Sequence, residues 1–440
     1  CSRNDHPPLQ NKAPSFACYC PALNSIANSF NKLKKTKIVT NFINLSIIQL
    51  SNMMLLVIMY PIISRIVGLE NFGFVMLASS FAGLAGIVIN YGTNQSGIKD
   101  IAVKKDLAEP LARAFYNTLG IRAAMFLLFL ILFLFLQWFD IGYYSFLLFA
   151  IPLVLAEVFN PLFFFLGQEK LSIYNGANLV SKIIIITLII IFVNGPGDSI
   201  WVNFIMGMVT TVTYIILLVH AVKKFNIVFR IPEKSAMMTM SRENFYLTGN
   251  NISVHLQQSL MIFAIAKWGN PLWLGAYSLV DKVIWSLRLL IMSVSNAVYP
   301  KAAQLFYDGE KEWRKYMSIM KGRITVLFLI PSIIIFCFPE PIVRVLAGQD
   351  DTNAVTFLRL MAFLPTLAAL NSLNVLHLLI RNDNRSIFRI AVILLIISAV
   401  SAWFLVFHKY TFLFGAYTLL IEASALAMYE YIIKRKYLTR

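Results

Sequence analysis

Ionisable side chains inside long apolar segments are the residues of this 440-residue chain best suited to chemistry. A charge near the middle of a lipid bilayer costs about 2.5–3.5 kcal/mol, so it needs a partner, water or a function. Glu157 and Lys182 fall at similar depths in neighbouring apolar segments, and we expect them to form an ion pair. Such a pair would either fix helix packing or act as a switch linked to a proton or a ligand.

A second group of ionisable residues lies further along the chain. His255 and Asp281 are expected at similar depths on facing helices, where a carboxylate–histidine pair could carry a proton. A lone histidine on a helix is, however, more often structural. Arg288 follows Asp281 by two helical turns, and its guanidinium could bind an oxyanion through two hydrogen bonds. Glu422 is also expected near mid-membrane, without a partner that the sequence identifies.

Uncharged polar residues in the apolar segments suggest a hydrated cavity. Gln49 and Asn52 share one face of the first apolar segment, Asn90 ends the second, and Gln258 lies on the same stripe as His255. Amides and aromatic rings offer hydrogen bonds and flat apolar faces, which suit a polar organic ligand. Lys282 is a further cavity candidate, although it is expected to point away from Asp281.

Two arginines have simpler interpretations. Arg65 lies near an expected outer helix end, where it could contact either a lipid headgroup or a ligand. Arg122 precedes a long apolar run and could extend to the inner membrane interface.

No motif for catalysis, nucleotide hydrolysis or metal binding occurs in the sequence. There is no Walker lysine motif and no nucleophile elbow. The chain has 4 cysteines, and the spacing of Cys18 and Cys20 does not match the usual zinc motif. We therefore predict no catalytic residue, no metal and no cofactor.

The elements that would carry these residues are membrane-spanning helices. The chain is 58% apolar and only 13% charged, against roughly 25% charged residues in soluble proteins. This composition excludes a soluble enzyme, a disordered chain and a coiled coil. Twelve unalternated apolar segments are expected to form helices, since only helices and closed barrels span bilayers. They lie at about 41–67, 72–95, 113–138, 143–167, 170–193, 200–222, 244–267, 272–300, 318–338, 354–380, 386–407 and 411–433.

The net charge of +17 would suggest nucleic-acid binding in a soluble protein. Here the basic residues gather in alternate connections, whereas the other connections hold only Arg65, Lys267, Arg344 and Lys409. This bias is typical of membrane proteins and predicts that both termini are cytoplasmic. We expect no nucleic-acid partner.

The domain organisation follows from these segments. We expect a cytoplasmic segment at 1–40 that is disordered or foreign to the protein, bundles of six helices at 41–222 and 244–435, a linker at 223–243 and a basic tail at 436–440.

Weak internal repeats relate the two expected bundles. Residues 156–175 align with 370–389 at an offset of 214, and Gly68–Phe74 resembles Gly269–Tyr277. Because six is even, both halves enter the membrane from the same side, and a pseudo-two-fold axis along the membrane normal is expected. Two bundles that rock about a central site are typical of transporters.

Several segments resemble a known family, the polysaccharide-biosynthesis flippases of the Wzx type. Their superfamily includes the multidrug-and-toxin-extrusion (MATE) exporters and the lipid II flippases. The resemblance covers about 40–440 and is carried by residues 60–80, 91–102, 274–283, 296–300 and 357–383.

The resemblance implies an all-α polytopic protein with twelve transmembrane helices in two pseudo-symmetric bundles. It implies movement of an undecaprenyl-diphosphate-linked glycan, an O-antigen or capsule repeat unit, to the outer leaflet of the bacterial plasma membrane. Membrane lipid, a polysaccharide polymerase and chain-length proteins are the partners that it allows. Arg65 comes nearest to the arginines with which the family usually contacts the diphosphate.

Two alternatives stay open. A cation-coupled multidrug exporter of the same superfamily would usually carry carboxylates in its first half, and the first apolar segment here has none. A polysaccharide polymerase or ligase would need a long outer loop with catalytic side chains, and the longest outer connection, about 339–353, is short. A lipid II flippase would usually have two more helices.

Overall fold

The computed structural model describes residues 55–139 and 142–438, which are almost entirely helical and contain no strand. All of them belong to one compact unit, Asn44–Arg440. Gln49 and Asn52 lie outside the described residues. The predicted boundaries between the two bundles and the linker stay a prediction.

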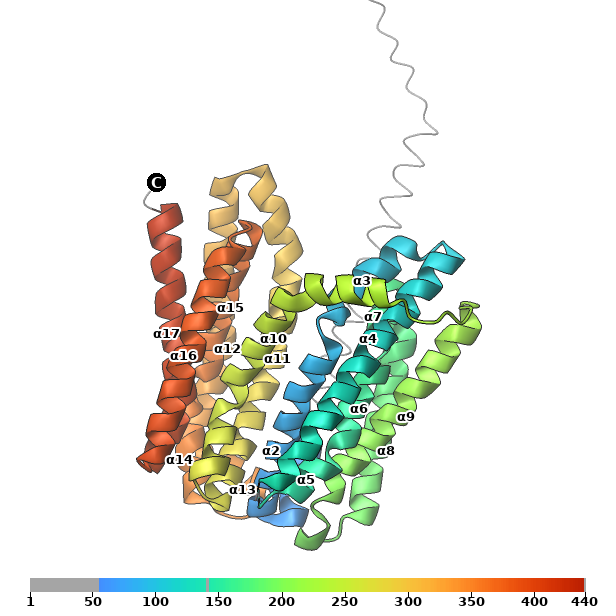
Figure 1. Ribbon diagram of the computed structural model, residues 1–440. Coiled ribbons are helices and arrows are strands. Elements are labelled where there is room, and N and C mark those ends of the chain that lie inside the picture. Colours follow the sequence, from blue (N-terminus) through green and yellow to red (C-terminus); the bar gives the residue numbers. More distant parts are fainter. Residues whose placement is uncertain (1–54, 140–141, 439–440) are drawn as a thin grey trace, which may run out of the picture. The chain divides into compact units, whose positions relative to one another are not determined.

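The first half of the described chain contains eight α-helices (Figure 1). They are α2 (Tyr60–Asn90), which continues from the π-helix η1 (Leu55–Met59), α3 (Thr93–Lys104), α4 (Ala108–Phe135), α5 (Tyr144–Phe149), α6 (Ile151–Phe159), α7 (Leu162–Gly167), α8 (Leu171–Phe192) and α9 (Trp201–Lys224). Short 3₁₀ turns follow α4 and α8, at Leu136–Trp138 and Pro196–Asp198.

The second half also contains eight α-helices, two of them unusually long (Figure 1). They are α10 (Lys234–Trp268), α11 (Pro271–Asp308), α12 (Glu310–Cys337), α13 (Pro339–Ala347), α14 (Thr352–Met361), α15 (Leu364–Ile380), α16 (Asn384–Phe407) and α17 (Phe414–Ile433). A 3₁₀ turn, Thr411–Leu413, precedes α17, and the π-helix η5 (Lys434–Leu438) follows it.

Local sequence signals explain where several helices begin and bend. Asn270 accepts a hydrogen bond from the Trp273 backbone at 2.8 Å and is followed by Pro271, so α11 begins with a capped first turn. In α2 the helix is interrupted at Gly68, with φ 76° and ψ 160°. Because only glycine adopts this conformation readily, Gly68 marks the boundary between the first two predicted segments.

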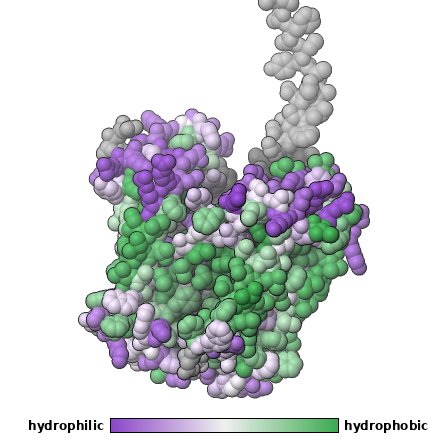
Figure 2. All heavy atoms as spheres, viewed as in Figure 1, coloured by the Kyte–Doolittle hydropathy of each residue, from purple (hydrophilic) through white to green (hydrophobic). Residues whose placement is uncertain are grey.

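Nine helical stretches of the described chain are long and apolar enough to cross a membrane. The helices α10 and α11, of 35 and 38 residues, are also long enough, but polar side chains lower their hydropathy. Figure 2 shows an apolar band between two hydrophilic ends. The predicted membrane fold is therefore confirmed, whereas the count of twelve spans stays a prediction, since most of 41–67 lies outside the described residues.

One predicted repeat recurs in the backbone geometry. Glu169 and Asn382 both have φ 57° and lie at equivalent turns, after α7 and α15. At each turn the next residue bonds five residues back: Lys170 N to Phe165 O at 2.8 Å, and Asp383 N to Leu378 O at 2.9 Å. These turns are 213 residues apart, so the offset of 214 is wrong here by one residue.

The other repeat lies where the two halves meet, along α2 and α11. A Cβ atom on Gly275 would lie 1.9 Å from Leu69 O, and one on Gly73 would lie 2.6 Å from Gly275 N. Gly73 and Gly275 lie in the two segments of the predicted repeat, so this contact joins the repeat segments of the two halves. Nearby, Ser64 Oγ donates to Leu346 O at 2.9 Å, which joins α2 to α13 at the same end.

Candidate functional site

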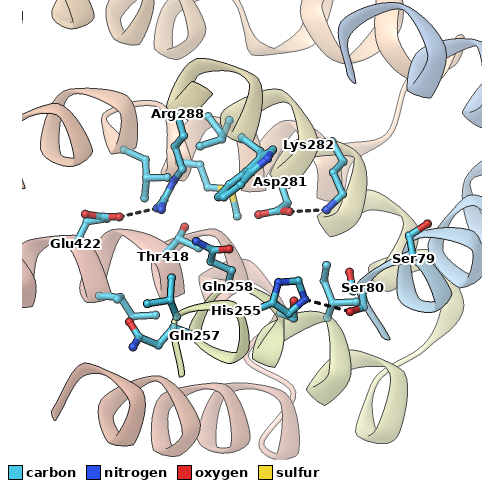
Figure 3. A pocket seen from close by; sticks show the side chains of 18 of the residues that line it. Ser79, Ser80, His255, Gln257, Gln258, Asp281, Lys282, Arg288, Thr418 and Glu422 are labelled. Atoms are coloured by element: carbon cyan, nitrogen blue, oxygen red, sulfur yellow. Dashed lines mark hydrogen bonds and ion pairs between the residues drawn. The ribbon is translucent and has the colours of Figure 1, made fainter. Parts of the chain in front are cut away.

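A polar cavity of about 370 Å³ lies between α2 and the helices α10, α11 and α17. We call it the charged compartment (Figure 3). Its polar lining consists of Tyr60, Ser79, Ser80, His255, Gln257, Gln258, Ser259, Asp281, Lys282, Trp285, Arg288, Thr418 and Glu422. The structure thus brings together five of the predicted site residues: Gln258, His255, Asp281, Lys282 and Arg288.

Two ion pairs line this compartment. Arg288 Nη2 lies 2.6 Å from Glu422 Oε1, and Lys282 Nζ lies 3.2 Å from Asp281 Oδ2 (Figure 3). Asn371 Nδ2 donates to the second oxygen of Glu422 at 2.6 Å. Each cation is therefore neutralised by a carboxylate, and an anionic ligand would have to replace that carboxylate.

The sequence did not reveal the role of Glu422, because its partner is 134 residues away. The expectation that Lys282 points away from Asp281 was wrong, since both line the same compartment and pair with each other.

His255 has a different partner from the one that we predicted. Its Nε2 atom lies 3.1 Å from the backbone oxygen of Ser80 on α2, whereas Asp281 pairs with Lys282 (Figure 3). The structure therefore places His255 and Asp281 in one compartment without joining them. His255 instead connects the second half to the first.

A larger cavity of about 930 Å³ adjoins the first and shares Tyr60, Ser79, His255, Gln258 and Trp285 with it. We call it the amide compartment. Its other polar lining residues are Asn90, Asn94, Gln95, Glu157, Asn160 and Asn251. The predicted candidates Asn90 and Glu157 thus lie here rather than beside the ion pairs.

Arg122 is the main functional candidate that the sequence interpretation missed. The expectation that it extends to the membrane interface was wrong, because its side chain is 0% exposed. It donates to Thr93 Oγ1 at 2.7 Å, Asn94 Oδ1 at 3.0 Å and Asn160 O at 2.7 Å. Arg122 thereby joins α4 to α3 and to the break between α6 and α7. An arginine so close to an apolar run was the available signal.

The predicted pair of Glu157 and Lys182 stays a prediction. Glu157 Oε2 accepts a hydrogen bond from Asn160 Nδ2 at 3.2 Å and lines the amide compartment. Lys182 is buried in α8, with 9% of its surface exposed.

Arg65 lies away from both compartments. Its guanidinium donates to the backbone oxygen of Val345 in α13, and its side chain packs against Gly348. In this conformation Arg65 therefore connects the two halves near Gly73 and Gly275 and does not line the cavity.

The charged and amide compartments, of about 370 and 930 Å³, both fall within the range of about 300–1,000 Å³ that suits an organic ligand. Among the residues with described positions, no group of three His, Cys, Asp or Glu side chains is placed to hold a metal ion.

Comparison with known proteins finds a matching family and a relative. The family described as "Polysaccharide biosynthesis protein" matches residues 38–306. A protein of Escherichia coli (strain K12) described as "Putative O-antigen transporter" is 21% identical over 360 residues, which cover 80% of this chain and 86% of that protein.

Solved structures of MATE transporters share the fold. An inward-facing multidrug resistance transporter of the MOP superfamily has a TM-score of 0.69 at 13% identity, covering 87% of this chain and 94% of its own. The MATE multidrug transporter DinF-BH has a TM-score of 0.59 at 14% identity, covering 91% of this chain and 95% of its own. At these identities the structures show the fold alone. The chain has the fold of a membrane transporter, and it belongs to the polysaccharide biosynthesis protein family.

Proposed function

We propose that this protein moves an undecaprenyl-diphosphate-linked oligosaccharide from the inner to the outer leaflet of the bacterial plasma membrane. The glycan and diphosphate would cross through the cavity between the halves by alternating access, while the lipid tail stays in the bilayer. The observation that carries this proposal is a cavity that combines ion-paired cations with many amides. Family membership and the O-antigen transporter relative support the same class of substrate.

The chemistry of the charged compartment fits a diphosphate. Arg288 can bind two phosphate oxygens with its planar guanidinium, and Lys282 can add a compact charge on the same helix. Both cations are already paired with carboxylates, so binding would exchange Glu422 or Asp281 for phosphate oxygens. Such an exchange keeps the cation paired, and the displaced carboxylate can pair with it again when the diphosphate is released at the other face.

The contacts between the halves support one conformation of this cycle. Gly73 and Gly275 touch, and Ser64 and Arg65 bond to α13, at the end that the charge bias predicts to be extracytoplasmic. The cavity lining includes Asn94 and Gln95 of α3, at the opposite end. We therefore assign this conformation as outward-closed, with both termini cytoplasmic.

Purified protein in lipid vesicles tests the proposal. A synthetic undecaprenyl-diphosphate oligosaccharide is placed in one leaflet, and its appearance in the other is followed with an impermeant lectin. We expect transport above protein-free vesicles, and a loss of at least about tenfold in Arg288→Met. A pH gradient applied in parallel shows whether protons drive the step.

The alternative is a cation-coupled multidrug exporter, and a polymerase or ligase is a more distant one. Efflux of a cationic dye with no movement of the glycolipid would overturn the flippase proposal. A polysaccharide polymerase and chain-length proteins would be the partners that receive the exported unit.

A further inference from the structure

The two compartments differ in chemistry as well as in position. The four charged residues of the charged compartment, Asp281, Lys282, Arg288 and Glu422, all belong to α11 and α17 of the second half. The amide compartment is lined mainly from the first half, by the end of α2, the start of α3 and the break between α6 and α7. A ligand that spans both would meet charges at one end and amides at the other.

The wall of the amide compartment is held in place by Arg122. This fully buried guanidinium bonds to Asn94 Oδ1 and to the backbone oxygen of Asn160. Asn160 in turn donates to Glu157 at 3.2 Å, and Asn90 Oδ1 accepts from Asn94 N at 2.9 Å. The wall is therefore organised before any ligand arrives, which lowers the cost of ordering side chains on binding.

Other polar groups of the same compartment are available to a ligand. Gln95, Asn251 and Gln258 line it, and no side-chain hydrogen bond is described for them within residues 55–139 and 142–438. Each amide offers both donors and an acceptor, which matches hydroxyl groups that also donate and accept.

The same wall disfavours a diphosphate. Glu157 contributes a carboxylate, and no lysine or arginine stands among the described lining residues of this compartment, whereas Asp281 and Glu422 of the charged compartment are each paired with a cation. The nearby cation, Arg122, is fully buried and directs its described hydrogen bonds to neutral oxygen atoms. A carboxylate beside amides can still accept hydrogen bonds from hydroxyls.

We infer that the amide compartment is the glycan subsite, where Gln95 and Asn251 bind sugar hydroxyls while the diphosphate stays on Arg288 and Lys282. This inference rests on the proposed function and adds an orientation for the substrate. The diphosphate points towards α11 and α17, and the sugars extend towards α2, α3 and α6. The first half together with α10 then determines which glycans are accepted.

Two lipid-linked substrates that differ only in glycan length, called the single-sugar carrier and the tetrasaccharide carrier, test this inference. Vesicles receive either undecaprenyl diphosphate with one N-acetylhexosamine or the same lipid with a tetrasaccharide. In the double variant Gln95→Ala/Asn251→Ala we expect tetrasaccharide transport to fall roughly tenfold and single-sugar transport to change less than about twofold, because the lost bonds reach only the distal sugars. Arg288→Met is expected to slow both carriers.

Asn71→Ala is the matched control, since its amide bonds to Val67 O on α2 and lines neither compartment. Thermal melting of each purified variant checks that folding is preserved. Equal slowing of both carriers in the double variant, or no slowing of either, would overturn the subsite assignment while the proposed function stands. If the wild-type protein moves neither carrier, the proposed function fails, and the subsite fails with it.

Discussion

Arg288 on α11 and Glu422 on α17 form an ion pair across the charged compartment, with an Nη2–Oε1 distance of 2.6 Å. Their side chains are 23% and 13% exposed, so water screens the pair only in part. Asn371 holds the second carboxylate oxygen, which fixes Glu422 and leaves Arg288 as the group that a phosphate can reach.

Breaking this pair from one side should cost more than removing it altogether. In Arg288→Met, Glu422 keeps only Asn371, and we expect the free energy of unfolding to fall by about 1–3 kcal/mol. In the double variant Arg288→Met/Glu422→Leu we expect part of that loss to be recovered, because no charge stays unpaired. Denaturant unfolding in detergent gives both values, and equal losses would show that the pair is not coupled.

Arg122 should be indispensable for the architecture of the first half. Its replacement by leucine leaves Thr93 and Asn94 without their donor, and we expect a loss of about 3–5 kcal/mol in unfolding free energy. Arg122→Lys keeps the charge, but its three donors sit on one nitrogen and cannot replace the separate Nε, Nη1 and Nη2 donors of the guanidinium, so we expect an intermediate loss. Thermal melting of purified variants measures this order.

The matched control is Arg113→Leu on the same helix, because Arg113 is about half exposed and pairs with Glu109 at the surface. Its loss should cost at most about 1 kcal/mol. If both replacements lowered the stability by the same small amount, Arg122 would not organise the wall of the amide compartment.

The contact between α2 and α11 should depend on glycine at position 275. A methyl group there would lie 1.9 Å from Leu69 O, so Gly275→Ala must push the two helices apart. We expect this variant to favour opening at this end of the cavity, which we propose to be extracytoplasmic. An impermeant maleimide should then label Ser64→Cys at least about threefold faster, since Ser64 is 2% exposed here.

This experiment needs a background in which the 4 native cysteines are replaced. Gly176→Ala on α8 is the control, because a Cβ atom there meets nothing within 4 Å. That change should stabilise the helix by about 0.5–1 kcal/mol and leave the labelling rate unchanged. Unchanged labelling in Gly275→Ala would mean that the glycine contact does not close the cavity.

The stability of the protein should depend on pH through Asp383, which lies in the turn before α16. Burial by itself would raise its pKa, but hydrogen bonds from Lys436, Ser386 and Tyr437 outweigh it and lower the pKa to about 2. A carboxyl whose pKa is lowered by folding stabilises the protein above its unfolded pKa, near 4, and this contribution disappears as the pH falls towards 2.

We therefore expect Asp383→Asn to be less stable than wild type by about 1 kcal/mol near pH 7, and the difference to vanish near pH 2. Melting temperatures across this range provide the measurement. Asp308→Asn, at an exposed position, is the control and should show no such trend. If the variant stayed less stable than wild type at low pH, the loss of stability would come from altered packing and not from the lost charge.

Helix positions were largely predictable because they depend on local composition. Runs of apolar residues identify spans such as α8 and α16, and Gly68 and Asn270 mark a break and a cap from their own residue types. The resemblance to the flippase family was carried by short segments and agrees with the family match over 38–306. The polar face of α11 could likewise be read from the spacing of Asp281 and Arg288.

The hydrogen-bond and ion-pair partners of the polar side chains could not be predicted in the same way. The sequence placed His255 opposite Asp281, yet His255 bonds to Ser80, 175 residues away, and Arg288 to Glu422, 134 residues away. Arg122 is buried and hydrogen-bonded because α3 and the break after α6 pack around it. Helical periodicity states which residues share a face, whereas the rotation and depth of each helix against its neighbours decide which faces meet. These depend on contacts between distant segments, which only the folded chain contains.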